Sequence, residues 1–398
     1  MGKPKIRFKG YEDDWEQRKF ADMAIRESAV QTASQEIPGV EYDDVVVEEG
    51  CLNKDISSKE TKKSGILFDG SQVLYGKLRP YLHNWLNPDF KGVAVGDWWV
   101  LKPIDLNKNF LYRLIQTQQF DNIANQSAGS KMPRADWNLI SNSAFMVPFS
   151  NEEQRKIGDY FLSLDHLITL HQRKCEETKS LKKYMLQKMF PENGNCVPKI
   201  RFSGFADAWE QRKVTDLGEI YIGLVTTMTE HYTDKGHLLI RNSDIKDGYF
   251  EFGENPIYLD EEFSEQNKSR MHQLGDVITV HTGDIGTSAV IGENEVNSIG
   301  FATIVTRPNQ KILDSNYFAT YLNTDTHKQW AISMATGDGR SNYNLKDYTK
   351  LVVPIPQIEE QKKIATCIGN LNNLITLHQH KCDELQKLKK FMLQNMFV

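Results

Sequence analysis

The chain has 398 residues, of which 39% are hydrophobic and 25% are charged, and its formal net charge is −5. This length exceeds what one hydrophobic core normally organises and suits two or three domains. The acidic balance counts against a protein that coats nucleic acid without sequence preference, because such proteins are basic. No run approaches the ~18 consecutive apolar residues that cross a bilayer, and the charged start of the chain lacks the apolar segment of a signal peptide. We therefore expect a cytoplasmic protein with no membrane contact, and its five scattered cysteines fit reduced thiols.

An internal repeat organises the chain. Residues 4–19 (PKIRFKGYEDDWEQRK) and 198–213 (PKIRFSGFADAWEQRK) are identical at 12 of 16 positions. Residues 152–190 and 359–397 match without a gap at 23 of 39 positions, whereas the stretches between these segments hardly resemble each other. A duplicated catalytic domain would keep its reactive residues in both copies. The pattern instead indicates a duplicated frame with two divergent inserts, as expected for two readers of two different targets.

The repeat predicts four parts in chain order. They are a first globular domain over 1–151, a helix and spacer over 152–197, a second globular domain over 198–357, and a second helix and spacer over 358–398. Within the first spacer, the Pro, Gly and Asn residues of PENGNCVP (191–198) end the helix and form a linker.

Each globular domain, called a head below, reads as mixed α/β with short strands. Stretches rich in β-branched and aromatic residues, broken by Gly and Pro, predict strands within 65–82, 92–103 and 145–149, and within 237–245, 274–292, 298–308 and 350–356. Residues 110–126 and 317–333 look helical and occupy equivalent places. The predicted fold class is therefore α+β, with two mixed α/β heads joined by two long antiparallel helices in a pseudo-twofold repeat.

Both long helices carry apolar residues at alternating spacings of four and three, as in a heptad seam. The predicted core of the helix pair consists of Ile157, Phe161, Leu164, Ile168 and His171 from the first helix, and Ile364, Ile368, Leu371, Ile375 and His378 from the second. Neither helix can bury its apolar stripe alone, so we expect the two to pack against each other. If the heads lie at opposite ends, the pair runs antiparallel and holds the heads a fixed distance apart.

Signatures of catalysis are incomplete. The segment GSQVLYGK (70–77) has five residues between its glycines where a P-loop has four, and Leu78 stands where a P-loop has the Ser or Thr that holds magnesium. The segment NPIY (255–258) matches the Asn-Pro-Pro-Tyr/Phe signature of adenine methyltransferases only in part, and no Gly-rich cofactor loop precedes it. HExxH and GxSxG motifs do not occur. We therefore expect a non-catalytic protein with no cofactor in this chain.

Two His/Cys pairs have the residue types of a Cys2His2 zinc site: His171 with Cys175, and His378 with Cys382. The histidines are the midpoints of the matched helices. Centred antiparallel pairing therefore brings them together and moves each cysteine one turn away in opposite directions. The sequence favours ordinary seam residues, with the histidines helping to fix the register, and predicts no metal.

Glycine-containing polar loops provide the candidates for DNA contact. In the first head, 75–85 carries Lys77, Arg79 and Tyr81, and 128–137 carries Lys131 and Arg134. In the second head, 281–288 carries His281 and Thr282, and 335–344 carries Arg340, Asn342, Tyr343 and Asn344. Arg and Lys bind phosphates or guanine, Asn reads adenine, and Gly permits close approach of the backbone. Such residues also form ordinary turns, so the equivalent placement of 128–137 and 335–344 carries more weight than any single side chain.

The whole chain resembles the specificity subunit of type I restriction-modification systems. The resemblance rests on the repeated opening PKIRFxGFxxxWEQRK, on GSKMPR, and on the runs EEQRKIGDYFLSLDHLITLHQRK and VVPIPQIEEQKKIA. The order head–helix–head–helix is also the order of that family. The second head departs from the pattern, because it has GDGRSN where the first has GSKMPR, so the two loops are open to different roles.

The resemblance implies that each head is a target-recognition domain that reads one half of a split DNA site, while the helices set the spacing and dock the partners. The implied partners are double-stranded DNA, two modification (methyltransferase) subunits and the restriction (translocase and nuclease) subunits. S-adenosylmethionine, ATP and Mg²⁺ are then expected on those partner subunits. Two alternatives stay open: a coiled-coil adaptor that binds proteins but no DNA, and a fused nuclease or methyltransferase with a cryptic site.

Overall fold

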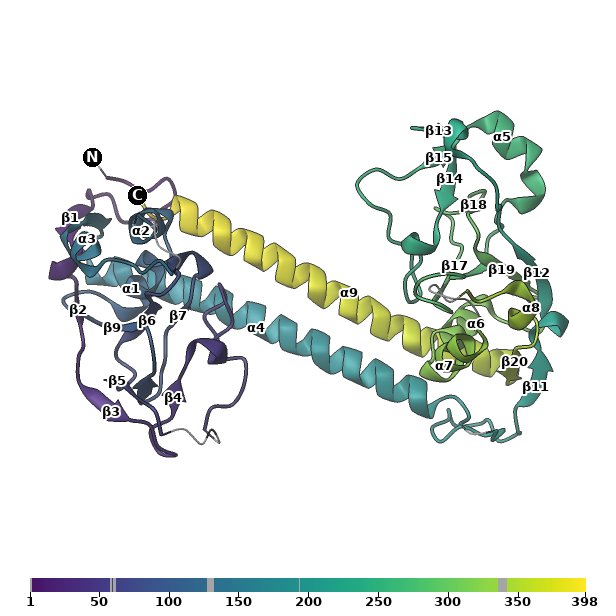
Figure 1. Cartoon of the computed structure of the whole chain (residues 1–398), viewed down its shortest axis with the longest axis horizontal. Helices are drawn as coiled ribbons and strands as arrows, with labels where there is room; N and C mark the ends of the chain where they lie inside the picture. The colour runs from purple at the N-terminus through teal and green to yellow at the C-terminus, as the bar shows by residue number, and fades with distance from the viewer. Residues whose placement is uncertain (1, 58, 60–61, 127–131, 193, 336–341) are drawn as a thin grey trace. The chain divides into compact units, whose positions relative to one another are not determined.

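A computed structural model describes residues 2–57, 59, 62–126, 132–192, 194–335 and 342–398. The chain forms two compact units: unit 1 contains Met1–Arg173 and His378–Val398, and unit 2 contains Lys174–Leu377. Each unit combines one head with parts of the two long helices, α4 (Asn151–Lys188) and α9 (Ile358–Asn395) (Figure 1).

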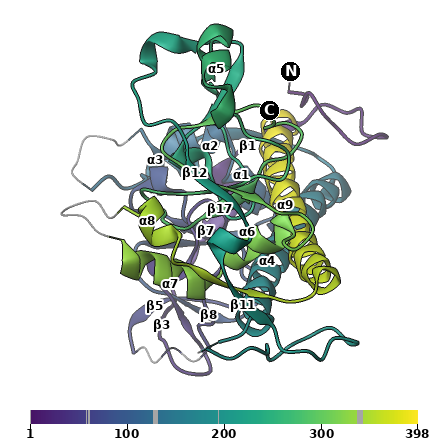
Figure 2. The same cartoon turned by 90° about the vertical axis from the view of Figure 1, so that its right-hand side faces the viewer.

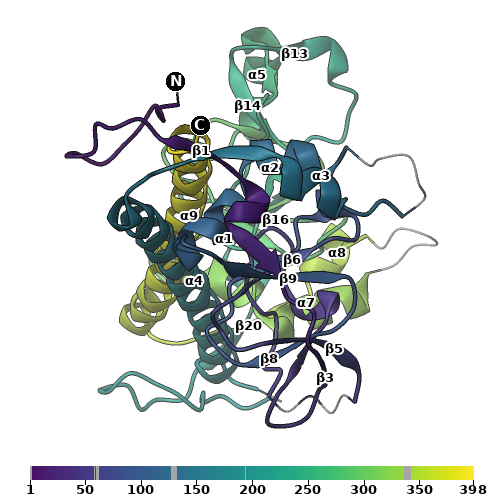
Figure 3. The ribbon, with the colours of Figure 1, turned by 90° about the vertical axis from the view of Figure 1, so that its left-hand side faces the viewer.

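The head of unit 1 consists of small sheets (Figure 3). Its described strands form a pair, β1-β10, and two four-stranded sheets with the orders β2-β9-β6-β7 and β3-β5-β8-β4, in which only β4 and β8 run parallel. The strands are β1 (Glu16–Lys19), β2 (Ala24–Arg26), β3 (Val30–Thr32), β4 (Gly39–Val40), β5 (Ser64–Phe68), β6 (Val73–Gly76), β7 (Trp85–Leu86), β8 (Gly92–Ala94), β9 (Trp98–Pro103) and β10 (Ala144–Val147).

The head of unit 2 repeats part of this plan (Figure 2). The pair β11-β20 and the sheet β12-β19-β16-β17 correspond to β1-β10 and β2-β9-β6-β7, whereas the remaining sheet has the order β13-β15-β14-β18. The strands are β11 (Glu210–Lys213), β12 (Gly218–Ile222), β13 (Tyr232–Thr233), β14 (His237–Ile240), β15 (Tyr258–Leu259), β16 (Val277–Thr279), β17 (Ser288–Val290), β18 (Ile299–Gly300), β19 (Ile304–Pro308) and β20 (Val352–Ile355). Strand β14 has neighbours on both sides, but its counterpart β4 lies at an edge, so the outer sheets have diverged.

The helices of the heads follow the same correspondence. Unit 1 has α1 (Lys108–Leu114), α2 (Gln118–Ala124) and α3 (Trp137–Asn142), and unit 2 has α5 (Glu261–Gln266), α6 (Ser315–Leu322), α7 (Asp325–Met334) and α8 (Leu345–Tyr348). Each predicted helical stretch is split in two. The breaks come at Thr117 and Thr324, whose side chains cap the second helix of each pair by accepting from the N–H of Phe120 and His327.

The repeated opening has the same role in both units. β1 pairs with β10 from Glu16↔Val147 to Lys19↔Ala144, and β11 pairs with β20 from Glu210↔Ile355 to Lys213↔Val352. Ahead of these strands, the N–H of Ile6 donates to the carbonyl of Asn395 at 2.9 Å, and the N–H of Ile200 donates to the carbonyl of Lys188 at 2.9 Å. Each opening therefore joins the C-terminal end of one long helix to a head.

Aromatic side chains extend this junction into the core. In unit 1, Trp15 and Phe110 contact Phe397, with ring centroids 6.2 Å and 5.2 Å away. In unit 2, Trp209 and Tyr317 contact Phe190 in the same way, at 6.1 Å and 5.6 Å. Since all these side chains are buried, the end of each long helix is part of the hydrophobic core of a head.

A buried ion pair completes each junction. Arg7 donates to both carboxylate oxygens of Glu153, at 2.6 Å and 2.9 Å, and Arg201 donates to both oxygens of Glu360, at 2.8 Å each. The glutamate side chains are almost fully buried, whereas the arginines retain slight exposure. Hydrogen bonds to these carboxylates raise the pKa of both guanidinium groups, so the pairs remain charged.

The long helices run antiparallel, as predicted, and they do so within each unit. In unit 1, Lys389 lies 2.7 Å from Asp165, and the thiol of Cys382 contacts the carbonyl of Ile168. In unit 2, the thiol of Cys175 contacts the carbonyl of Ile375. Of the predicted helix-pair core, the side chains of Ile157, Phe161, Leu164, Ile168, Ile364 and Ile368 are buried, and those of Leu371, Ile375, His171 and His378 are half-buried. Within the described residues, no helix is long and apolar enough to cross a membrane.

The two central histidines of unit 1 meet. Nδ1 of His171 lies 3.0 Å from Nδ1 of His378, at hydrogen-bonding distance. The thiols of Cys175 and Cys382 are directed to backbone carbonyls of the facing helix instead of to this pair. Among the described residues, no three His, Cys, Asp or Glu side chains are grouped so that they could hold a metal ion.

The region between the first helix of each head pair (α1 or α6) and the long helices is filled in unit 1 and open in unit 2. In unit 1, Arg113 of α1 is buried, donates to Asp165 of α4, and lies over the rings of Tyr112 and Phe161. The carboxylate of Asp165 also binds Lys389. A charged side chain and its partners therefore fill this space.

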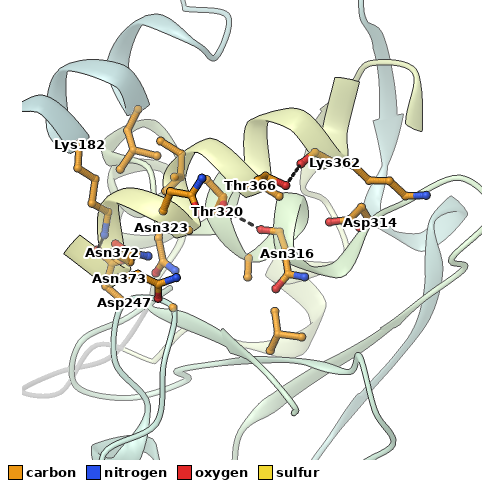
Figure 4. Close-up of a pocket in the computed structure, with 18 residues that line it drawn as sticks. Lys182, Asp247, Asp314, Asn316, Thr320, Asn323, Lys362, Thr366, Asn372 and Asn373 are labelled. Atoms are coloured by element: carbon orange, nitrogen blue, oxygen red, sulfur yellow. Dashed lines mark hydrogen bonds and ion pairs between the residues drawn. The ribbon is translucent and has the colours of Figure 1, made fainter. Parts of the chain in front are cut away.

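In unit 2, a pocket of about 330 Å³ lies between α6, α9 and the C-terminal part of α4 (Figure 4). The equivalent of Arg113 is Thr320 and that of Asp165 is Asn372, since α1 and α6 align from their capping residues Asn107 and Asp314. Lys182, the equivalent of Lys389, pairs instead with Asp247 at 2.8 Å. The smaller side chains of unit 2 leave the pocket open.

Candidate nucleic-acid interface

The two loops of unit 1 that carry candidate DNA contacts lie side by side. The N–H of Ala135 donates to the carbonyl of Lys77 at 2.8 Å, and the N–H of Arg79 donates to the carbonyl of Pro133 at 2.7 Å. These bonds form a short antiparallel contact just beyond the end of β6. Segments far apart in the sequence thus form one surface.

Asp97 links the cations of this surface. Its carboxylate lies 3.4 Å from Nζ of Lys77 and accepts from Nη2 of Arg134 at 3.1 Å and from Nε at 3.4 Å. The hydrogen bond from Arg134 and the charges of both cations lower the pKa of Asp97. Since about half of the Arg134 side chain remains exposed (52%), the carboxylate fixes a guanidinium group that still faces solvent.

A tyrosine below the surface holds the backbone of Asp97 in place. The hydroxyl of Tyr42 donates to the carbonyl of Asp97 at 2.6 Å and accepts from the N–H of Leu78 at 3.1 Å. The ring of Tyr42 packs edge-on against Trp98, with centroids 4.6 Å apart. Burial raises the pKa of Tyr42, so its hydroxyl keeps the proton that it donates.

The other candidates of unit 1 lie on the adjoining turn. Arg79 is half-buried and has φ of +48°, a strained value for a residue with a side chain, and Tyr81 is exposed. His83 stacks on Trp85 and contacts the carboxylate of Asp121 at 3.0 Å, so it supports the turn. Lys131 lies outside the described residues.

The loops of unit 2 meet in the same way. The N–H of Tyr343 donates to the carbonyl of His281 at 2.9 Å, and Thr282 faces Asn342 across an antiparallel bridge. The hydroxyl of Thr282 donates to Oδ1 of Asn342 at 2.8 Å and lies 2.7 Å from Nδ1 of His281. The N–H of His281 donates to Oδ1 of Asn242 at 2.8 Å. Neutral polar groups here occupy the place of the charged groups of unit 1.

One candidate of unit 2 needs correction. The side chain of Tyr343 is fully buried and packs against Tyr348 and Trp330, so in this structure it belongs to the core and does not reach DNA. Loop composition alone did not distinguish this inward-facing tyrosine from its neighbours. Asn344 is half-buried at the start of α8, and Arg340 lies outside the described residues.

The structure adds residues that the sequence did not indicate. Asp97 and Tyr42 in unit 1, and Asn242 in unit 2, contact the predicted loops from segments distant in the sequence. Asp97 follows a glycine with φ of +102° at the start of β9, a signal of a turn but not of a partner. Only the strand pairing shows which loops these residues support.

Comparison with known proteins agrees with this architecture. The family described as "Type I restriction modification DNA specificity domain" matches the chain twice, over residues 12–180 and 206–387. The chain is 21% identical over 339 residues to the type I restriction enzyme MjaVIII specificity subunit of Methanocaldococcus jannaschii, covering 82% of this chain and 76% of that protein. It is 27% identical over 133 residues to the EcoBI specificity subunit of Escherichia coli, covering 33% of this chain and 28% of that protein.

Solved structures share the fold. The S subunit of a type I restriction-modification system from M. genitalium superposes with a TM-score of 0.63 at 13% identity, covering 99% of both chains. A chain from a study of complex assembly and conformational transition of the type I R-M system superposes with a TM-score of 0.55 at 16% identity, covering 97% of this chain and 98% of that one. The predicted α+β class with long packed helices is thereby confirmed. The twofold match of the family over most of the sequence shows that the chain belongs to the type I restriction-modification DNA specificity family, whose members are the non-catalytic specificity subunits of their complexes.

Proposed function

We propose that the chain is the subunit that selects a bipartite DNA site, with each head reading one half of it. The observation that carries this proposal is the pair of equivalent loop contacts, 77–79 with 133–135 and 281–282 with 342–343. Both rest on the same sheet order, yet they present different side chains. A duplicated frame with different polar groups at the same place is what two readers of different sequences require.

The helices would set the spacing of the two half-sites, because both α4 and α9 contribute to both units. S-adenosylmethionine, ATP and Mg²⁺ would be bound by partner subunits, and the complex would act on DNA in the cytoplasm.

The helices also offer a surface for the partners. In unit 1, Leu167, Leu388 and Phe391 are exposed, and in unit 2 their repeat equivalents Leu374, Leu181 and Tyr184 are exposed. Leu167 and Leu374 come one residue before the seam residues Ile168 and Ile375, and the other four come one residue before positions that continue the same spacing of four and three. Equivalent flanks of the heptad pattern lie on the same side of an antiparallel helix pair, so within each unit the three side chains share one face. Such repeated apolar faces are suited to docking two like modification subunits.

An exchange of heads tests the recognition proposal. Residues 1–151 are replaced by the corresponding head of another specificity subunit, and the methylated sites are mapped after assembly with the modification subunits. We expect one half of the site to change and the other to stay the same. A change in both halves, or in neither, contradicts the proposal, and failure of the assembled complex to bind any duplex favours a protein adaptor.

A charge placed on the apolar face tests the docking proposal. Leu388→Glu should weaken association with modification subunits by about tenfold or more, because it buries a carboxylate in an apolar contact. Thr376→Glu adds the same charge on the opposite flank of α9 and should leave association unchanged. Titration calorimetry of the purified subunits measures both, and equal effects of the two variants would contradict the proposal.

A further inference from the structure

The two loop surfaces differ in the hydrogen-bonding groups that they offer, and this difference points to the bases that they read. In the major groove, guanine presents two acceptors, N7 and O6, whereas adenine presents an acceptor, N7, and a donor, the N6 amino group. A surface made of donors alone therefore suits guanine. A surface with a donor beside an acceptor suits adenine.

Unit 1 offers donors. Lys77 and Arg134 have only N–H groups, and both are held by the single carboxylate of Asp97. The carboxylate engages the Nε and Nη2 side of the guanidinium group, which fixes the orientation of its plane. A guanidinium group oriented in this way loses less conformational freedom on binding than a mobile one.

Unit 2 offers both kinds of group, because a chain of hydrogen bonds fixes the tautomer of His281. Oδ1 of Asn342 is an acceptor, so the hydroxyl of Thr282 must donate its only hydrogen to that oxygen. Thr282 can then only accept from Nδ1 of His281, 2.7 Å away. In the neutral imidazole this leaves Nε2 as an acceptor, while the amide nitrogen of Asn342 remains a donor. Burial lowers the pKa of His281 and so favours the neutral ring.

The position equivalent to Asp97 supports the same distinction. The register of the central sheets identifies this position. β2 pairs Ala24 with Pro103 of β9, and β12 pairs Gly218 with Pro308 of β19, so Asp97 and Ala302, each six residues before its proline, are equivalent. In unit 2 the residue is Ala302, which carries no charge. Unit 2 therefore has no carboxylate at this place to hold a cation.

We propose that the surface of unit 1 reads guanine with Arg134 and Lys77, positioned by Asp97, and that the surface of unit 2 reads adenine with His281 and Asn342, positioned by Thr282. This inference rests on the proposed function and adds to it the class of base for each head. Asp97 and Thr282 are positioning residues, since they act through the side chains that they hold.

Two isosteric variants test it in the complex assembled with modification subunits. Asp97→Asn removes the charge that fixes Arg134, and Thr282→Val removes the hydroxyl that links His281 to Asn342. Methylation of a randomised DNA library by each variant reports base preference at every position of both half-sites. Asp22→Asn, an exposed change on the short turn after β1, is the matched control.

Asp97→Asn should reduce discrimination by about tenfold or more at a G·C pair in the half-site assigned to residues 1–151, and leave the other half unchanged. Thr282→Val should do so at an A·T pair in the other half only. The unaffected half in each variant shows that the protein still folds and assembles, and Arg134→Gln should reproduce the position affected by Asp97→Asn. The inference is overturned if the affected positions carry the other base pair, or if neither variant alters any preference. Failure of the unmodified complex to methylate any split site would instead refute the proposed function itself.

Discussion

Units 1 and 2 share a frame but fill it differently. Where head and helices meet, unit 1 buries Arg113 against Asp165, whereas unit 2 has Thr320 and Asn372 around an open pocket. The junction itself is the same in both, with an arginine–glutamate pair and an aromatic residue from the end of a long helix. The comparison teaches that the repeat preserved the attachment of each head, while the head and the space next to it diverged together.

The largest effect should come from the shared junction. Arg7→Met and Arg201→Met each leave a buried glutamate without its partner, which costs about 3–5 kcal/mol of the free energy of unfolding. Each change should lower hydrogen-exchange protection mainly in its own unit, as measured by mass spectrometry of unit-specific peptides. Similar losses would show that the junctions are equivalent. A loss confined to one variant would show that the units use the shared arginine differently.

The second-largest effect should come from acid, which should destabilise unit 2 more than unit 1. His272 and His327 of unit 2 are fully buried, and burial lowers their pKa to about 3 and about 4. The pKa of a histidine in the unfolded chain is about 6.5, so below this pH the unfolded chain binds protons that the folded unit does not. The free energy of unfolding is therefore highest above this pH and falls as the pH is lowered, by about 2 kcal/mol per histidine at pH 5.

In unit 1 the described histidines are half-buried or exposed, so this loss should be confined to unit 2. Exchange protection measured from pH 7 to pH 5 checks it, and His327→Gln should reduce the pH dependence of unit 2. An equal decline in the two units would contradict the assignment.

The smallest effect on stability should come from exchanging the residues that lie between head and helices in the two units. Arg113→Thr makes unit 1 resemble unit 2 and opens a space beside Phe161, which should cost about 2–3 kcal/mol. Thr320→Arg combined with Asn372→Asp makes unit 2 resemble unit 1 and should raise its stability by about 1 kcal/mol, because the pocket has room for the new ion pair. Denaturant unfolding measures both. Destabilisation by the paired change would show that the pocket is shaped for something other than an arginine side chain.

Much of the frame could be predicted from the sequence because its signals are local and repeated. The spacing from Ile157 to His171 predicts a long amphipathic helix, and its recurrence from Ile364 to His378 predicts the partner. The antiparallel arrangement is expected if the heads lie at opposite ends, and centred pairing then predicts the contact of the midpoints His171 and His378 that is seen in unit 1. The breaks at Thr117 and Thr324 were missed although threonine is a common helix cap, since the apolar pattern continues through them.

The sequence predicts where the recognition surface lies, but not which residues support it or which side chains face outward. Gly, Pro and polar residues mark the loops around Lys77 and His281, but tertiary contacts decide that Asp97 and Asn242 support them. The inward orientation of Tyr343 and the burial of Arg113 likewise depend on tertiary packing, because tyrosine and arginine are also common at surfaces. Long-range contacts of this kind leave no periodic trace in the sequence.

The position of Phe397 in the core of unit 1 also sets an order of folding during synthesis. Unit 2 is continuous in the chain, whereas unit 1 needs the end of α9 to complete a core that begins with Trp15. At about 5–20 residues per second, the ribosome delivers Phe397 on the order of 10–40 s after the first part of unit 1 is made. The head that is synthesised first is therefore completed last, and in that interval the core residues that Phe397 covers are exposed to chaperones or to premature association.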